Sequence, residues 1–125
     1  MPGMDGLTVI REAKRYKGDL PVIIITGFST ESSAIEAVKP GVPAASVDAA
    51  ARSLLESRGL GEAFGHGTGH GLGLDIHEEP RIGPPRSHSA SVQLEPGMVF
   101  TIEPGAYFPG LGGVDYIKRA AILKD

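Results

Sequence analysis

Three of the four histidines of this chain lie within a stretch of twelve positions, as His66, His70 and His77. Glycine recurs between them over residues 65–73, so a side chain there can approach a ligand without crowding from the backbone. The neutral imidazole nitrogen is a common ligand of transition metals and a common proton carrier. The pattern predicts a metal or proton-transfer site, and a loop of solvent-exposed histidines remains the alternative.

Strand geometry adds an expectation about which histidines meet. In an extended chain His66 and His70 share one face, whereas His77 faces the other way unless a bulge intervenes. The fourth histidine, His88, lies in the polar stretch 84–89 and is interpreted as solvated. No G-x-G-x-x-G spacing, no Walker-type Gly-Lys-Ser/Thr and no serine-hydrolase elbow occurs, which argues against nucleotide binding and serine hydrolysis.

The elements that must position these histidines follow from the composition. The 18 Gly and 10 Pro make 28 of the 125 residues, about 22% against roughly 12% in an average protein, which excludes a long helical bundle. Fourteen of the glycines follow residue 40, so the chain is expected to change character near Lys39. One domain spanning residues 1–125 is expected at this length.

Apolar periodicity predicts three helices and one buried strand before residue 59. The first helix follows a cap at Asp5 and ends at Gly18, and the third has Ser46 as its N-cap and Gly59 as its stop. The predicted elements are helices over 7–17, 30–39 and 47–58 and a strand over 22–26. Residues 59–73 are predicted to contain no helix, and strands are predicted over 98–103, 106–108 and 114–123. The expected fold class is α+β, with α/β as the alternative and the helices packed on a mixed sheet.

Charge and composition exclude several partners. Lys and Arg number 12 against 15 Asp and Glu, for a formal charge of −3 and a pI near 5.8, so nucleic acid is not an expected partner. No apolar stretch is long enough to span a membrane. The chain has no cysteine, and its N-terminus has no signal-peptide pattern, so a cytoplasmic location is expected.

Two motifs closely resemble the pita-bread metallopeptidases, a family that includes Xaa-Pro aminopeptidases, prolidases and methionine aminopeptidases. They are HGTGHGLGLDIHEEP over 66–80 and LEPGMVFTIEPG over 94–105, and the resemblance extends over about 34–113. In this family two divalent metals activate a bridging water for attack on a peptide carbonyl. The resemblance implies that His70 and Glu103 are metal ligands for manganese, cobalt or zinc. It implies that His77 stabilises the reacting carbonyl and that His66 lies on the substrate side.

The same resemblance predicts an incomplete centre. The family has two aspartate ligands on a strand pair that has no counterpart before Ala34, and Ile117 stands where the final glutamate is expected. Three of five ligands are then missing, which predicts a severe loss of metal affinity and water activation. On this interpretation His66 and His77 are vestigial, no cofactor is required, and peptidase activity is not expected.

The first residues resemble a different family. MPGMDGL over 1–7 and PVIIITG over 21–27 are similar to the middle of a response-regulator receiver, a flavodoxin-like domain. Thr26 and Lys118 would correspond to its switch threonine and its phosphate-contacting lysine. The phosphoacceptor aspartate precedes this motif in receivers and has no counterpart here, so no phosphorelay partner is expected.

These resemblances predict a recombined, engineered chimera with no complete active site and no evolved catalytic function. Its segments would be receiver-like over 1–39, pita-bread-like over 40–113, and a closing strand over 114–125. One alternative is a residual mononuclear metal binder that uses His70 and Glu103. Another is an Xaa-Pro aminopeptidase-like metallohydrolase in which an assembly supplies ligands such as Asp75 or Asp115. A homodimer formed by pairing of strand edges is expected.

Overall fold

Helices and short antiparallel strands alternate along the computed structural model, which describes residues 6–16, 30–85, 91–115 and 118–122. The helices are α1 (Gly6–Tyr16), α2 (Thr30–Ala37) and α3 (Ala44–Ser57), followed by the single 3₁₀ turn η1 (Gly61–Ala63). The strands are β1 (Gly69–Gly71), β2 (Glu78–Ile82), β3 (Val99–Ile102), β4 (Gly105–Phe108), β5 (Gly112–Asp115) and β6 (Lys118–Ile122).

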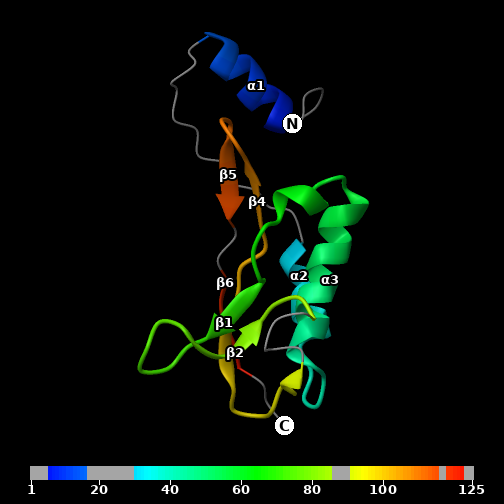
Figure 1. The fold of residues 1–125 in the computed structure, drawn as a ribbon, viewed down its shortest axis with the longest axis vertical. Helices are drawn as coiled ribbons and strands as arrows, with labels where there is room; N and C mark the ends of the chain where they lie inside the picture. Colours follow the sequence, from blue (N-terminus) through cyan, green and yellow to red (C-terminus); the bar gives the residue numbers. More distant parts are fainter. Residues whose placement is uncertain (1–5, 17–29, 86–90, 116–117, 123–125) are drawn as a thin grey trace.

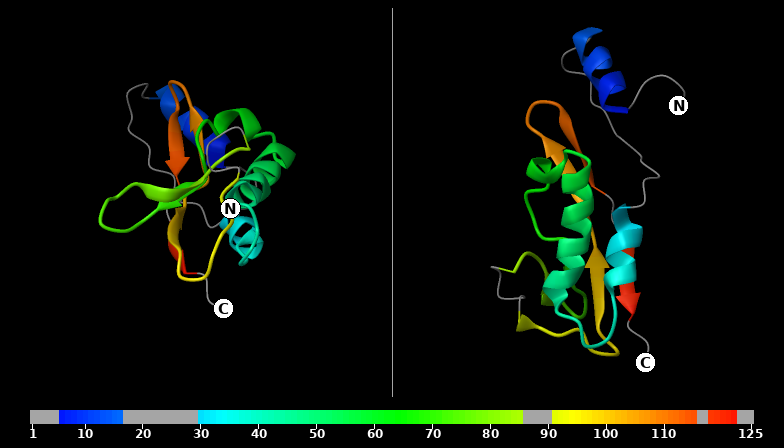
Figure 2. Two further views of the ribbon diagram at one scale, coloured as in Figure 1. Left: turned by 60° about the horizontal axis from the view of Figure 1, so that its bottom comes forward. Right: turned by 90° about the vertical axis from the view of Figure 1, so that its right-hand side faces the viewer.

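The strands form a four-stranded sheet of order β2-β1-β3-β6 and a separate β4–β5 hairpin. Every strand pair in the described part of the chain is antiparallel. Helices α2 and α3 lie side by side against the four-stranded sheet (Figures 1 and 2). The fold class is therefore α+β, as expected from the sequence. The predicted strand over 22–26, which would have made the sheet mixed, lies outside the described residues.

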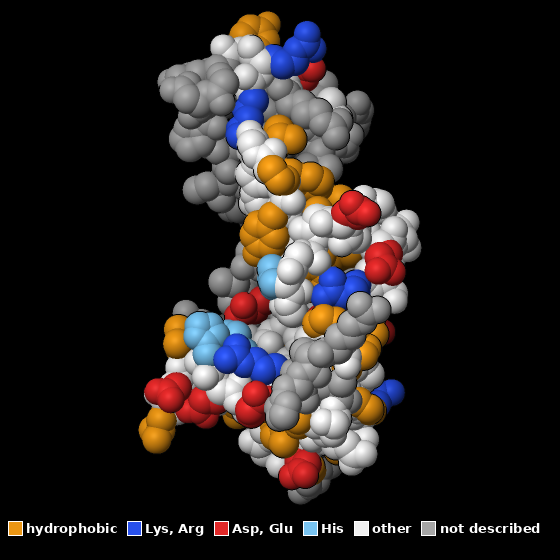
Figure 3. All heavy atoms as spheres, viewed as in Figure 1, with side chains coloured by type: hydrophobic (Ala, Val, Ile, Leu, Met, Phe, Trp, Pro, Cys, Tyr) orange, Lys and Arg blue, Asp and Glu red, His pale blue; other side chains and the backbone are white. Residues whose placement is uncertain are grey.

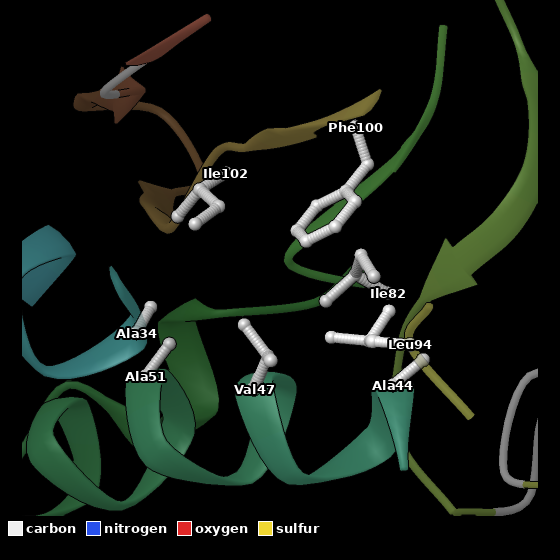
Figure 4. Packing of buried hydrophobic residues seen from close by; sticks show 8 residues of the cluster. All are labelled: Ala34, Ala44, Val47, Ala51, Ile82, Leu94, Phe100 and Ile102. Carbon is white, nitrogen blue, oxygen red and sulfur yellow. The ribbon is translucent and has the colours of Figure 1, made fainter. Parts of the chain in front are cut away.

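The core lies between α3 and the sheet (Figure 4). Small alanines on the helices let the backbones come close, and larger side chains from the sheet and its loops fill the space between them. Phe100 on β3 is fully buried, and it faces Ile82 of β2 and Val47 of α3. The cluster consists of Ala34, Ala44, Val47, Ala51, Ile82, Leu94, Phe100 and Ile102. Burial of this apolar surface is the main force that holds the helices on the sheet.

The start of α3 differs from the prediction. The N-cap is Pro43 rather than Ser46, and Ser46 lies in the first turn, where its hydroxyl donates a hydrogen bond of 2.7 Å to the Pro43 carbonyl. The Ala44 amide instead donates to the Val92 carbonyl at 2.8 Å. A tertiary contact thus satisfies one of the first amides of the helix, which have no partner within the helix itself. The predicted stop is confirmed, since Gly59 has a φ of 71° just after the helix.

The glycine-rich stretch contains more regular structure than predicted. It includes η1 and the inner strand β1, although residues 59–73 were expected to contain no helix. A Cβ atom on Gly69 would meet the Thr101 carbonyl, and one on Gly71 would meet the Glu79 carbonyl. Glycine is needed at these two positions because neighbouring backbones approach β1 closely on both sides.

The ends of the described chain show two further points. Helix α1 lies next to the β4–β5 turn (Figure 1), and Lys14 Nζ donates to the Gly110 carbonyl at 3.1 Å. The single strand predicted over 114–123 is divided between β5 and β6, which belong to different sheets. Asp5 and Gly18, which were predicted to begin and end the first helix, lie outside the described residues. No helix in the described ranges is long and apolar enough to cross a membrane.

Candidate functional site

His70 and Glu103 come together although they are far apart in the sequence. His70 is the middle residue of β1, and Glu103 directly follows β3, the strand paired with β1. His70 Nε2 lies 3.6 Å from Glu103 Oε1, with side chains only 12% and 21% exposed. The two residues predicted to be metal ligands thus form a half-buried pair.

The hydrogen bonding of His70 shows which nitrogen faces the carboxylate. Its Nδ1 lies 2.9 Å from the Gly71 carbonyl oxygen. A carbonyl can only accept, so Nδ1 carries a proton, and Nε2 is the ring nitrogen that faces Glu103. Metal-bound histidines typically donate their second ring N–H to such an acceptor.

The pair has the chemistry of a cation site. A carboxylate oxygen and an imidazole lone pair both attract positive charge, and a shared cation satisfies both. Two ligands at roughly 2.1 Å from a tetrahedral zinc lie about 3.4 Å apart, close to the 3.6 Å observed. The two side chains therefore fit a divalent metal as neighbouring ligands.

Backbone contacts fix the positions of the pair. The His70 amide donates to Thr101 Oγ1 at 3.1 Å, and the Glu103 amide donates to the Thr68 carbonyl at 2.5 Å. Gly71 is also in register with Phe100. These contacts hold the segment that contains His70 against the strand that leads to Glu103.

His77 lies beside His70, with ring centroids 4.3 Å apart. The register shift between His70 and Gly71 provides the bulge that this arrangement was expected to require. Unlike His70, His77 is exposed, at the end of the loop that joins β1 to β2. Figure 3 shows histidine side chains on the surface here, close to basic and acidic groups.

His66 has different partners. Its Nδ1 donates to the Gly67 carbonyl at 2.7 Å, and its Nε2 is hydrogen-bonded to the Tyr107 hydroxyl at 3.1 Å. Its ring also packs edge-on against Phe64, with centroids 5.1 Å apart. Because its Nε2 is already hydrogen-bonded to the Tyr107 hydroxyl, His66 is less available as a metal ligand than His70.

Of the remaining predicted positions, the structure describes the side chain of Asp75 alone. Asp75 is exposed in the β1–β2 loop, and its amide donates to Glu78 Oε1 at 2.7 Å. Asp115 ends β5, whereas Ile117 and His88 lie outside the described residues. Among the side chains that the structure describes, no three His, Cys, Asp or Glu are grouped so as to hold a metal.

Sequence reasoning missed a buried polar group that lies between α3 and the histidine loop. Asp48 is fully buried on α3 and accepts hydrogen bonds from Arg52 and Thr68. An acidic residue within an apolar helix stripe, with arginine four positions later, is a signal that could have identified it. Thr101 and Tyr107 were also missed, because single hydroxyl residues in predicted strands give no such signal.

Comparison with known proteins identifies the family of this chain. The model of metallopeptidase family M24 matches residues 29–121. The chain belongs to this family.

Its relatives are dipeptidases and prolidases. The chain is 53% identical over 95 residues to the probable dipeptidase PepE of Mycobacterium tuberculosis. The aligned region covers 76% of this chain and 24% of the relative. A dipeptidase from Pyrococcus horikoshii OT3 has 53% identity and a TM-score of 0.65 over 71% of this chain and 24% of its own. The prolidase from Pyrococcus furiosus has 42% identity and a TM-score of 0.70, over 78% of this chain and 28% of the prolidase. The chain thus spans about a quarter of the length of these relatives.

The family match is longer than the resemblance recognised in the sequence. It extends past Gly113 to residue 121 and so includes β6, where Lys118 is in register with Ile102. The string around Lys118 therefore lies within a metallopeptidase match. Residues 1–28 lie outside the match.

Proposed function

We propose that this chain provides His70 and Glu103 as ligands to one divalent metal, manganese, cobalt or zinc, in a centre of the M24 type. The observation that supports this most directly is the distance of 3.6 Å between His70 Nε2 and Glu103 Oε1. When bound, such a metal polarises a carbonyl or lowers the pKa of a bound water.

The residues of the chain have separable roles in this proposal. His70 and Glu103 hold the metal, and the Gly71 carbonyl keeps the Nε2 nitrogen of His70 free for it. His77, exposed and beside His70, is placed to donate a hydrogen bond to a substrate carbonyl. His66 and Tyr107 form a polar pair on the β4 side that a peptide could contact.

The second candidate function is hydrolysis of dipeptides or Xaa-Pro peptides. Its support is the name of the relatives, which are dipeptidases and prolidases. Two protein ligands leave a two-metal mechanism incomplete. We therefore propose that the 125-residue chain by itself has metal affinity without peptidase activity.

Metal content tests the main proposal. The protein is purified without chelator and dialysed against manganese, cobalt or zinc, together with His70→Ala and His66→Ala. We expect about one metal per chain in the parent and in His66→Ala, and loss of the metal in His70→Ala. Equal metal content in the parent and His70→Ala, or none in any of the three proteins, would contradict the proposal.

A peptidase assay separates the two candidates. We expect no cleavage of an Xaa-Pro dipeptide by the metal-loaded chain. Cleavage that disappears in His70→Ala would establish the hydrolase instead, whereas cleavage that persists in His70→Ala would indicate a contaminating enzyme.

Three finer interpretations remain proposals. The receiver-like origin of residues 1–39 and the chimera rest on the sequence resemblance alone, and residues 29–39 of that segment lie within the metallopeptidase match. A homodimer is proposed through β2 or β6, the outer strands of the described sheet, because unpaired strand edges can pair with another copy. Light scattering tests the dimer, and a monomer at high concentration would contradict it.

A cytoplasmic location is proposed from the lack of cysteine.

A further inference from the structure

Asp48 is a fully buried carboxylate whose two oxygens accept four hydrogen bonds. Arg52 Nε donates to Oδ2 at 3.1 Å, and Arg52 Nη2 donates to Oδ1 at 3.2 Å. The amide and the hydroxyl of Thr68 donate to Oδ1 at 3.0 and 2.9 Å. Such charge-assisted bonds are stronger than neutral ones, and a buried carboxylate is costly without them.

Thr68 links this carboxylate to the proposed metal ligands. Its nitrogen and hydroxyl face Asp48, while its carbonyl accepts from the Glu103 amide. Two residues later His70 begins its own contact with β3 through Thr101 Oγ1. The position of Thr68 therefore affects both members of the His70–Glu103 pair.

Arg52 fixes the other end of the same loop. Its Nη1 donates to the Phe64 carbonyl at 3.0 Å, and its Nη2 donates to the His66 carbonyl at 2.9 Å. The guanidinium carbon lies 4.4 Å from the centre of the Phe64 ring, which is a cation–π distance. Helix α3 thus holds both ends of the segment 64–68 through one ion pair.

A loop rich in glycine needs such restraint. Glycines 65, 67 and 69 have a large conformational freedom that must be lost when the loop adopts one conformation. We propose that Asp48 and Arg52 are positioning residues that hold the glycine loop so that His70 and Glu103 face each other. This inference rests on the proposed metal-binding function.

The test uses the hydroxyl of Thr68. Thr68→Val removes its bond to Asp48 with little change in volume, Thr68→Ser retains the hydroxyl, and Asp48→Asn removes the charge. Ser57→Ala on α3 is the control, because its hydroxyl bonds only the Leu54 carbonyl of its own helix. The readouts are the nuclear Overhauser contact between the His70 ring and the Glu103 side chain in metal-free protein, and the dissociation constant for cobalt.

We expect Thr68→Val and Asp48→Asn to lose the His70–Glu103 contact at temperatures where circular dichroism shows both variants folded. Their cobalt affinity should fall by about tenfold or more, as for other residues that orient metal ligands. Thr68→Ser should retain the contact and the affinity, as should Ser57→Ala. The contact is measured without metal, so it tests positioning even if the parent binds no cobalt.

Two outcomes would overturn the inference. An unchanged His70–Glu103 contact in folded Thr68→Val and Asp48→Asn would show that the two strands alone position the pair. Failure of both variants to fold, with Thr68→Ser folded, would assign the network to the stability of the whole domain instead.

Discussion

The segment 64–77, which contains His70 and His77, has two halves with different surroundings. The first half, residues 64–71, lies against α3 and β3 and is held by the buried Asp48 and by Thr101. The second half, residues 72–77, extends into solvent, where Leu74 is 105% and Ile76 is 73% exposed. His70 belongs to the first half and His77 to the second. The comparison teaches that contacts with α3 and β3 give one histidine a fixed position, whereas the loop beyond them leaves the other accessible.

The largest expected difference in the free energy of unfolding is between a variant of the core beneath residues 64–71 and a variant of the exposed segment 72–77. Phe100→Ala should lower the free energy of unfolding by about 3–5 kcal/mol, because it removes a fully buried ring and leaves a cavity. Leu74→Ala should leave the free energy of unfolding unchanged within error. Urea denaturation of both variants measures the difference, and equal effects would show that the loop tip is packed in solution.

The next difference concerns two ion pairs. Arg52→Ala leaves the buried Asp48 carboxylate without its charge partner and should cost about 3 kcal/mol. Arg15→Ala removes an exposed arginine that pairs with Glu12 within α1 and should have little effect. Thermal unfolding at low and high salt tests both. A strong salt dependence of the Arg52→Ala effect would contradict a buried pair.

Two glycines sharpen the comparison within the first half itself. Gly69→Ala should cost about 1–3 kcal/mol, because the new methyl group meets the backbone carbonyl of Thr101 and that strand cannot move aside easily. Gly65→Ala should be tolerated, because nothing lies within 4 Å of its Cβ position. Chemical denaturation of the two variants measures the costs, and an equal loss at Gly65 would mean that the loop packs more tightly.

The smallest expected effect concerns Thr101. Thr101→Val removes the acceptor for the His70 amide and should cost about 1 kcal/mol. Amide hydrogen exchange at His70 should become faster while exchange in α3 stays unchanged. Unchanged protection at His70 would mean that β-sheet pairing alone protects this amide.

Much of the helical structure could be predicted from the sequence. The apolar repeat that includes Val47 and Ala51 indicates α3, and Gly59 marks its end. The true start of α3 could not be predicted, because its first amide is satisfied by the distant Val92 carbonyl. The strand β1 was missed for a similar reason, since glycine is depleted in strands and Gly69 is in a strand because it pairs with the distant Ile82 of β2.

The sequence by itself determined the α+β class, the helical segments and the two motifs that contain His70 and Glu103. These features depend on local periodicity and on residue type, which a sequence states directly. Only the tertiary structure decided which histidine faces Glu103, which nitrogen of that histidine is nearer to the carboxylate, and that Asp48 is hydrogen-bonded to Thr68 of the loop. Such facts depend on contacts between residues far apart in the chain, where a register shift of one residue reverses the face of a side chain.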